Sequence, residues 1–335
     1  MKKNHPYLIR EQVVKAIRQF FEKQSFHEVF VPVLNRALPL EPNLYAFETR
    51  WHHQDKTEKL YLPTSPESSL KKILARGFEK VFAIAPSFRN LEPVDVEHHP
   101  EFLMLEWYRT NANYEAIMDD VKELIKFVAN KIKLYLDDES QSSELVYQGE
   151  AINLKGKWRK VSLEKLFKEK VGCSFKDLSL SKLKKLAEKN GYQVLDATWE
   201  ELLNQFFMDK IEPDLGKQPL FLTDFPSRIS PLCKACANKP YLAERFEVYL
   251  GGLEIGNGNS ELTDSKLVKK KFLEEQKYRQ TPQLPTHGID QQFLQALSEM
   301  DQTGQSYAGI GLGVERLAMI LANQESLEEM LVLGL

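Results

Sequence analysis

Residues 309–316 read Gly-Ile-Gly-Leu-Gly-Val-Glu-Arg, with glycine at every second position and then an acid followed by a base. Alternate residues of a strand lie on the same face, so these glycines leave one face without side chains. We therefore predict a strand that ends at Val314 and runs directly into a helix from Glu315. Its bare face would form a flat floor for a planar or phosphorylated ligand. The stretch is neither a Walker loop nor a dinucleotide fingerprint, because the required spacing and lysine are missing.

Two stretches that precede this one also alternate and predict strands. Over residues 102–108 one face carries Leu103, Leu105 and Trp107, and the other carries Phe102, Met104, Glu106 and Tyr108. The first face suits a core, and the second places an acid and a phenol on a polar face. Residues 246–250 alternate too, and Gly251-Gly252 predicts a tight hairpin turn after which the chain returns at 253–255.

The spacing of apolar residues predicts the remaining helices and strands. Helical spacing of apolar residues predicts helices at the N-terminus (Ile9, Val13, Ile17, Phe20, Phe21), at about 114–135 and at 265–279. Strands are expected at 27–34 and 81–85, and residues of about 150–240 read as an inserted subdomain. Because strands gather at both ends around helical inserts, we predict an α+β fold with an antiparallel sheet flanked by helices.

Composition narrows the class of protein without naming its function. The chain has 335 residues, with 45 Lys+Arg against 48 Asp+Glu and 42% hydrophobic residues. No stretch approaches the roughly 18 apolar residues of a membrane span, and the N-terminus has no apolar segment typical of a secretory signal. The three cysteines cannot form a disulfide framework. These features exclude a membrane protein and a secreted mini-domain, and they favour a cytoplasmic protein.

Charge is concentrated in the insert. Residues 155–189 hold twelve basic and four acidic residues in a chain whose net charge is −3. Such a patch can hold an acidic partner, and it is equally typical of two solvated, lysine-rich helices.

Two further segments are candidates for chemistry. Arg89 closes a predicted strand and leads through a polar loop to His98, so it can share a cleft with the polar face of 102–108. In residues 254–261, Glu-Ile-Gly-Asn-Gly-Asn-Ser-Glu, two carboxylates bracket glycines. Carboxylate oxygens are the ligands that Mg²⁺ prefers. Cys233 and Cys236 have the spacing of metal ligands but lack the second pair that a zinc site needs.

Together these segments resemble the catalytic core of the class II aminoacyl-tRNA synthetases, in particular the lysyl branch. Residues 30–34 resemble motif 1, the dimer-interface element, and Gly309–Arg316 resembles motif 3. Phe88-Arg89-Asn90 through Pro100-Glu101-Phe102 to Arg109 resembles motif 2, and 244–247 with 254–264 resembles the lysyl substrate segment. The likeness spans nearly the whole chain, so we expect one catalytic domain over 1–335. We expect no anticodon-binding domain, because the motif 1 region begins by about residue 8.

Three local matches favour a subfamily, the truncated lysyl-synthetase paralogues that attach lysine or (R)-β-lysine to a lysine side chain of elongation factor P. The matches are Ala46–Arg50, Thr64–Glu67 and Glu212–Lys217. The resemblance implies a homodimeric ligase that uses ATP and Mg²⁺ to form an aminoacyl-adenylate. Two alternatives stay open. One is a stand-alone ligase that charges a tRNA or another small acceptor, and the other is a non-catalytic regulator that senses an amino acid.

The resemblance also implies roles for individual residues. Arg89, Arg316 and Glu254 are the expected catalytic residues, and Glu254 and Glu261 are expected to hold Mg²⁺ that arrives with ATP. The expected ATP-binding residues are Arg89, Asn90, Glu92, His98, Phe102, Glu254, Ile255, Gly313 and Arg316. The expected amino-acid-binding residues are Ser65, Pro66, Glu67, Tyr108, Asn257, Glu261 and Gly311. Among the latter, Glu261 and Tyr108 would bind the ε-ammonium group, and Ser65 and Glu67 would lie near the α-amino group.

The sequence departs from the family pattern at several positions. Leu91 stands where the family has an acid, and Glu92 follows it; Glu97 stands where an arginine lies near the phosphates. His99 replaces an asparagine, Asn259 replaces an aromatic residue beside the amino-acid pocket, and Gly311 matches the tRNA synthetases rather than the elongation-factor ligases. Lysine, β-lysine and a related amino acid therefore all remain open as the substrate.

Overall fold

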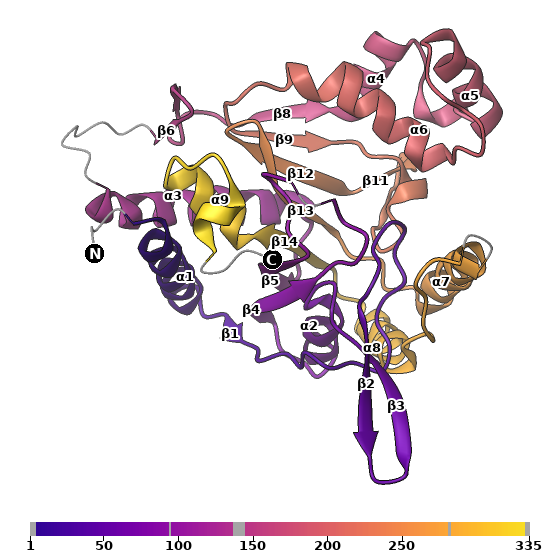
Figure 1. The fold of residues 1–335 in the computed structure, drawn as a ribbon, viewed down its shortest axis with the longest axis horizontal. Coiled ribbons are helices and arrows are strands. Elements are labelled where there is room, and N and C mark those ends of the chain that lie inside the picture. The colour runs from indigo at the N-terminus through magenta and orange to yellow at the C-terminus, as the bar shows by residue number, and fades with distance from the viewer. Residues whose placement is uncertain (1–4, 94, 137–144, 281–282, 332–335) are drawn as a thin grey trace.

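The computed structural model describes residues 5–93, 95–136, 145–280 and 283–331 (Figure 1). A mixed sheet of eight strands forms its centre, in the order β1-β4-β5-β14-β13-β12-β9-β8. The pairs β1–β4 and β8–β9 are parallel and the other neighbours are antiparallel. The strands are β1 (His27–Glu28), β4 (Lys80–Phe88), β5 (Glu101–Thr110), β8 (Arg159–Ser162), β9 (Leu220–Thr223), β12 (Arg245–Leu250), β13 (Leu253–Ser260) and β14 (Tyr307–Gly313). The predicted α+β class is confirmed.

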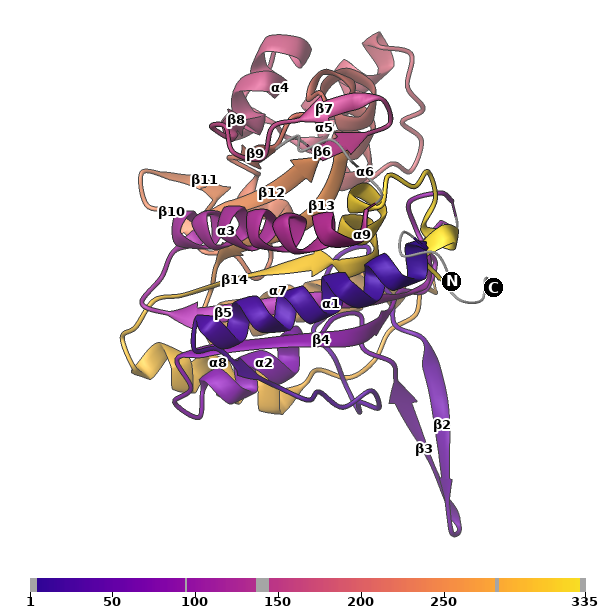
Figure 2. The ribbon, with the colours of Figure 1, turned by 90° about the vertical axis from the view of Figure 1, so that its left-hand side faces the viewer.

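One face of the sheet is covered by α1 (Pro6–Lys23), α3 (Tyr114–Ile132) and α9 (Val314–Leu321), which Figure 2 shows lying across the strands. The helical apolar positions predicted for α1 are all buried, and they pack with Leu105 and Trp107 of β5. The alternation of β5 is therefore confirmed, since its other face turns away from this core. An ion pair between Arg10 and Glu315 (2.7 Å) joins α1 to the start of α9.

The opposite face is covered only in part. There α2 (Glu67–Leu74), α7 (Ser265–Gln280) and α8 (Gln291–Gln302) pack on β4 and the end of β14 through a second apolar cluster that includes Leu70, Phe272 and Phe293. The rest of this face is left for a cavity.

The inserted segment forms its own apolar cluster from Leu163 to Tyr249, built on α4 (Leu163–Val171), α5 (Leu180–Lys189) and α6 (Trp199–Phe206). It extends the central sheet through β8 and β9. Short hairpins add β6 (Leu145–Tyr147) with β7 (Glu150–Ile152), and β10 (Ala235–Cys236) with β11 (Lys239–Ala243). The hairpin of β2 (Glu48–His53) and β3 (Lys56–Tyr61) projects away from the body (Figures 1 and 2).

The predicted turn between β12 and β13 is confirmed, with positive φ at Gly251 (66°) and Gly252 (88°), where a side chain would be strained. The strand predicted at 27–34 is wrong beyond Glu28. Only His27 and Glu28 pair with β4, and Phe30 is 90% exposed, so alternation there does not reflect pairing within this chain. Among the described residues, no helix is long and apolar enough to cross a lipid bilayer.

Candidate active site

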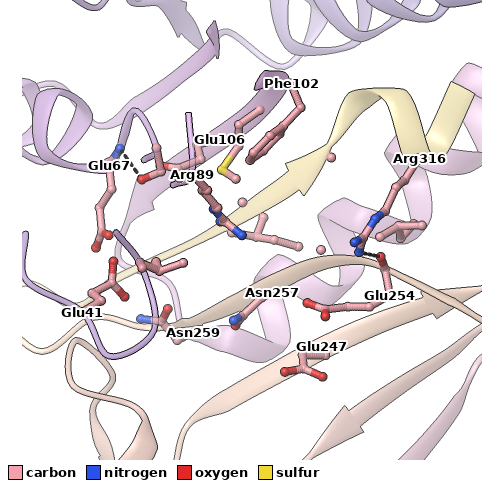
Figure 3. A pocket seen from close by; sticks show the side chains of 18 of the residues that line it. Glu41, Glu67, Arg89, Phe102, Glu106, Glu247, Glu254, Asn257, Asn259 and Arg316 are labelled. Atoms are coloured by element: carbon pink, nitrogen blue, oxygen red, sulfur yellow. Dashed lines mark hydrogen bonds between the residues drawn. The ribbon is translucent and has the colours of Figure 1, made fainter. Parts of the chain in front are cut away.

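A cavity of about 410 Å³ opens on the partly covered face of the sheet. Its floor is formed by β5, β13 and β14, and its walls come from the loop 41–44, the turn region after β4 and the loop 229–233. Figure 3 shows Arg89 and Arg316 reaching into it from separate elements. The glycines of β14 shape the floor, because Gly311 and Gly313 line the cavity.

Arg89 lies at the end of β4 and is positioned by backbone and ring contacts. Its amide donates to the carbonyl of Pro100 (2.9 Å), which closes the β4–β5 turn region. Its guanidinium lies over the ring of Phe102, 5.2 Å from the centroid. The nearest acid is Glu92, 3.6 Å from the guanidinium. A partly exposed guanidinium held by a ring and one weak ion pair keeps donors available for a phosphate or carboxylate.

Arg316 faces the other end of the cavity from the first turns of α9. Its side chain donates to the carbonyls of Glu97 (3.1 Å) and Glu254 (2.7 Å), so it bridges the loop before β5 and strand β13. Glu97, which stands where the family has an arginine, thus uses its backbone to position Arg316. Neighbouring Glu315 also lines the cavity, and its carboxylate accepts from Leu103 N–H (2.9 Å) and from Arg10.

Acids on adjacent strands gather beside Arg316. Glu247 of β12 and Glu254 of β13 both line the cavity, and the pKa of Glu247 is raised to about 8 by burial and by Glu254. Arg245 is paired with Glu247 (2.9 Å) and also donates to Asn257 (3.1 Å). Two carboxylates on adjacent strands, one of them with a pKa raised by burial and by its neighbour, favour a shared cation.

At the far end of the cavity a buried lysine joins two of the predicted residues. Lys71 of α2, whose side chain is fully buried, pairs with Glu67 one turn earlier and with Glu261 at 2.5 Å. Burial alone would lower the pKa of Lys71, but Glu261 and Glu67 outweigh it and raise it. The pKa of Glu261 is raised to about 7, chiefly by burial and against the effect of Lys71. Lys71 thus links α2 to β13.

The face of β5 toward the cavity carries two interacting polar groups. The Tyr108 hydroxyl donates to Glu106 (3.1 Å), and both side chains line the cavity. Burial, and then Glu67, raise the pKa of Glu106 well above its usual range. Burial also raises the pKa of Tyr108, so its hydroxyl stays a donor at neutral pH.

Most of the residues predicted from sequence line this one cavity. They are Ser65, Glu67, Arg89, Glu92, His98, Phe102, Tyr108, Glu254, Ile255, Asn257, Gly311, Gly313 and Arg316. Three predicted residues do not. Glu261 is held behind the wall by Lys71, Pro66 caps α2, and the Asn90 side chain accepts from Leu91 N–H (2.9 Å).

Four residues in or beside the cavity were not among the predicted site residues: Glu41, Lys71, Arg245 and Glu247, although the last two lie in the segment 244–247 that resembles the lysyl substrate segment. Arg245 and Glu247 share a strand face, which their alternation with apolar residues indicates. Lys71 and Glu67 look in the sequence like an ordinary i,i+4 surface pair. Glu41 lies in an irregular loop that carries no periodic signal.

The cysteine pair does not form a metal site; Cys233 lines the cavity, and no described group of three or more His, Cys, Asp and Glu side chains could hold a metal.

A mainly antiparallel sheet with a glycine-rich strand, two arginines that face one cavity and an acid pair on the neighbouring strands is the arrangement of a class II synthetase core. The sequence matches the family described as tRNA synthetases class II (D, K and N) over residues 2–334, and the chain belongs to this family. It is 35% identical over 334 residues to a lysine–tRNA ligase of Carboxydothermus hydrogenoformans, which covers 98% of this chain and 65% of that relative.

Two further relatives carry the same name. A lysine–tRNA ligase of Saccharolobus solfataricus is 33% identical, with 96% of this chain and 63% of the relative covered. One of Nostoc punctiforme is 36% identical, with 97% and 56% covered. The chain therefore spans less than two thirds of the length of these relatives.

Proposed function

We propose that the protein activates an amino acid with two ammonium groups, lysine or a close relative, as its adenylate, and transfers it to an amine acceptor. The observation that carries the proposal is that Arg89 and Arg316 face one cavity whose other end is lined by buried carboxylates. Cations suit the phosphates and the carboxylate of the substrates, and anions suit the ammonium groups. The lysine–tRNA ligases among the relatives support the same chemistry.

In the activation step a carboxylate oxygen of the amino acid attacks the α-phosphorus of ATP. The bond to the bridging oxygen breaks, and pyrophosphate leaves with the electron pair. Arg89 would bind the α-phosphate and the attacking carboxylate, and Arg316 would bind the nucleotide at the opposite side. Such charge-assisted contacts, aimed where negative charge develops, are the main catalytic contribution of the protein. Phe102 would stack under the adenine, with Glu92 and His98 beside the base.

The acid pair fits the Mg²⁺ that accompanies ATP. Glu254 and Glu247 offer oxygen ligands on adjacent strands, and the pKa of Glu247, raised by burial and by Glu254 despite its pairing with Arg245, supports a cation between them. Bound there, Mg²⁺ would neutralise charge on the phosphates. Glu261, the other residue expected to bind Mg²⁺, is already paired with Lys71, so we assign it no Mg²⁺ ligand role.

For the acceptor we propose a lysine side chain of elongation factor P. The support is the likeness of 46–50, 64–67 and 212–217 to ligases of that kind, and one of these segments supplies Ser65 and Glu67 to the cavity wall. Once deprotonated, an acceptor amine can attack the adenylate carbonyl directly and release AMP. No general base is required of the protein.

The second candidate acceptor is tRNA, which the names of the relatives favour. Gly311 also matches the tRNA-charging pattern rather than that of the elongation-factor ligases. Labelled lysine supplied with ATP and either purified elongation factor P or total tRNA separates the two. We expect label in the protein fraction. Label in tRNA alone would replace the proposed acceptor.

Activation itself is tested by amino-acid-dependent exchange of pyrophosphate into ATP. We expect exchange with lysine or β-lysine. If none of the twenty amino acids nor β-lysine supports exchange, the alternative of a non-catalytic amino-acid sensor takes the place of the ligase. We further propose a homodimer and a cytoplasmic location, which the exposed apolar residues after β1 and the free cysteines support.

A further inference from the structure

The amino-acid end of the cavity holds more carboxylates than the protein neutralises. Glu41, Glu67 and Glu106 line it, and Glu261 lies just behind. Lys71 pairs with Glu67 and Glu261. Within the described part of the chain, neither Glu41 nor Glu106 has an ion-pair partner. An uncompensated carboxylate in a protein cavity is unfavourable unless a cation reaches it.

Glu41 is presented to the cavity by an anchored turn. The buried guanidinium of Arg279 donates to the carbonyls of Glu41 and Leu44, the latter at 3.0 Å. Leu44 N–H donates to the Glu41 carbonyl (3.3 Å), which closes the turn. In Figure 3 the Glu41 carboxylate points toward that of Glu67 and lies beside the amide of Asn259. The backbone of this loop is therefore held in place, so the loop cannot easily move the Glu41 carboxylate out of the cavity.

Two loops bring Glu41 and Glu67 to the same side of Arg89. Asn90 N–H donates to the carbonyl of Tyr45 (2.7 Å), which follows the Glu41 turn. Phe88 N–H donates to the carbonyl of Pro63 (2.8 Å), in the segment that leads to Glu67. Both acids thus lie on one side of the arginine that would hold the carboxylate of the substrate (Figure 3). Glu106 and Tyr108 lie instead on the floor strand β5, opposite Gly311 and Gly309.

We propose that Glu41 is a specificity-determining residue that binds, together with Glu67, the ammonium group next to the carboxylate of the amino-acid substrate. Glu106 and Tyr108 then serve the distal ammonium group. This inference rests on the proposed function and names the substrate class of its site: an amino acid with two ammonium groups, each meeting a carboxylate that has no ion-pair partner among the described residues. The raised pKa of Glu41, about 7 through burial and the charge of Glu67, agrees with this arrangement.

Calorimetric binding of three ligands tests the proposal in the full chain. Lysine has both ammonium groups, 2-aminohexanoate has only the one next to the carboxylate, and 6-aminohexanoate has only the distal one. We expect Glu41→Gln to weaken lysine and 2-aminohexanoate about tenfold or more, the size of a lost hydrogen-bonded charge contact. Binding of 6-aminohexanoate should change less than about twofold. Glu41→Asp, which keeps the charge, should recover part of the loss.

The matched control is Glu188→Gln, the same substitution on the exposed face of α5 outside the cavity, which should leave all three affinities unchanged. Equal weakening of all three ligands by Glu41→Gln would overturn the proposal in favour of a structural role, and unchanged lysine binding would also overturn it. Pyrophosphate exchange by the unmodified protein separates a failure of the proposed ligase function from a failure of the role assigned to Glu41. If the protein binds lysine but shows no exchange, the ligase function is rejected. The role of Glu41 is decided by the affinities for the three ligands alone.

Discussion

Arg89 is the residue on which the catalytic proposal depends most directly. We expect Arg89→Ala to reduce lysine-dependent pyrophosphate exchange by a factor of about 10² or more, because an aimed cation at the reacting phosphate is lost. Its weak tie to Glu92 and its place over Phe102 predict little change in stability. Circular dichroism and thermal melting of the variant provide the control. Near-normal exchange would mean that the nucleotide lies elsewhere.

The acids of the amino-acid pocket make substrate affinity depend on pH. Burial, and then the charge of Glu67, raise the pKa of Glu41 to about 7, and its carboxylate must be ionised to attract an ammonium group. Protonation below pH 7 therefore weakens binding, and deprotonation above it restores binding. For one such group we expect the affinity for lysine to rise about tenfold from pH 6 to pH 8. Titration calorimetry across this range measures the slope, and Glu41→Gln should flatten it.

Two glycines of the floor strand should respond differently to the same substitution. A Cβ at Gly311 would lie 3.1 Å from Met104 Sδ and 3.3 Å from Glu106 Oε1, so Gly311→Ala presses on flexible side chains beside the substrate. We expect a higher KM for lysine with nearly unchanged stability. A Cβ at Gly309 would lie 2.1 Å from the Tyr108 ring and 2.7 Å from the Trp107 carbonyl.

Gly309→Ala should therefore destabilise the fold by about 2 kcal/mol, as overpacking of a core does. Thermal unfolding and exchange kinetics of both variants give the comparison. If Gly311→Ala unfolds as readily as Gly309→Ala, the cavity floor is packed more tightly than the side-chain contacts indicate.

At the scale of elements, Lys71 joins helix α2 to strand β13 across the sheet. Lys71→Met leaves Glu67 and Glu261 buried without their cation, and we expect a loss of about 3 kcal/mol in the free energy of unfolding. The folded-state pKa of Glu261 lies above its unfolded value, so the deficit is largest at high pH and shrinks as pH falls and this carboxylate protonates. Urea unfolding at pH 8 and pH 5.5 measures it. A deficit independent of pH would contradict this account.

The double variant Lys71→Met/Glu261→Gln supplies the matched control for that prediction. It removes one of the two carboxylates together with the ammonium group, so it should be more stable than Lys71→Met alone. Equal stability of the two variants would mean that the lost contacts of the ammonium group with the rings of Tyr108 and Phe293 cause the whole effect.

Elements whose signal is local were predictable from the sequence, and contacts between distant elements were not. Alternation placed β5, β12 and β14, since one buried face is enough to impose the period. It failed at 29–34, where the described structure assigns no strand and only the Val29 N–H continues the bonding to β4. The arginines were found because their motifs are contiguous. Glu261 was assigned to the substrate because nothing in the sequence shows that Lys71, 190 positions away, reaches its carboxylate.

At the scale of the whole molecule, the segment after β1 leaves apolar side chains uncovered. Phe30 is 90% exposed and Leu34 56%, although both sit in a stretch rich in valine. Isolated exposed apolar residues are common, but three within five positions, here Phe30, Val33 and Leu34, favour a contact between molecules. The resemblance of this segment to the dimer-interface element makes a second copy of the chain the expected partner.

Sedimentation velocity at micromolar concentration tests the dimer, and we expect a species of twice the chain mass of 38.8 kDa. Phe30→Asp should shift it toward the monomer, because burying a carboxylate at the centre of an apolar contact is unfavourable. The matched control is Phe78→Asp, since Phe78 is 41% exposed and lies outside this segment. Both variants keep the cavity residues intact, so lysine binding can be measured on the separated monomer. Retained binding would mean that the dimer only stabilises the fold, and lost binding would mean that the site requires the dimer. A monomer at every concentration would leave the exposed face to a different partner.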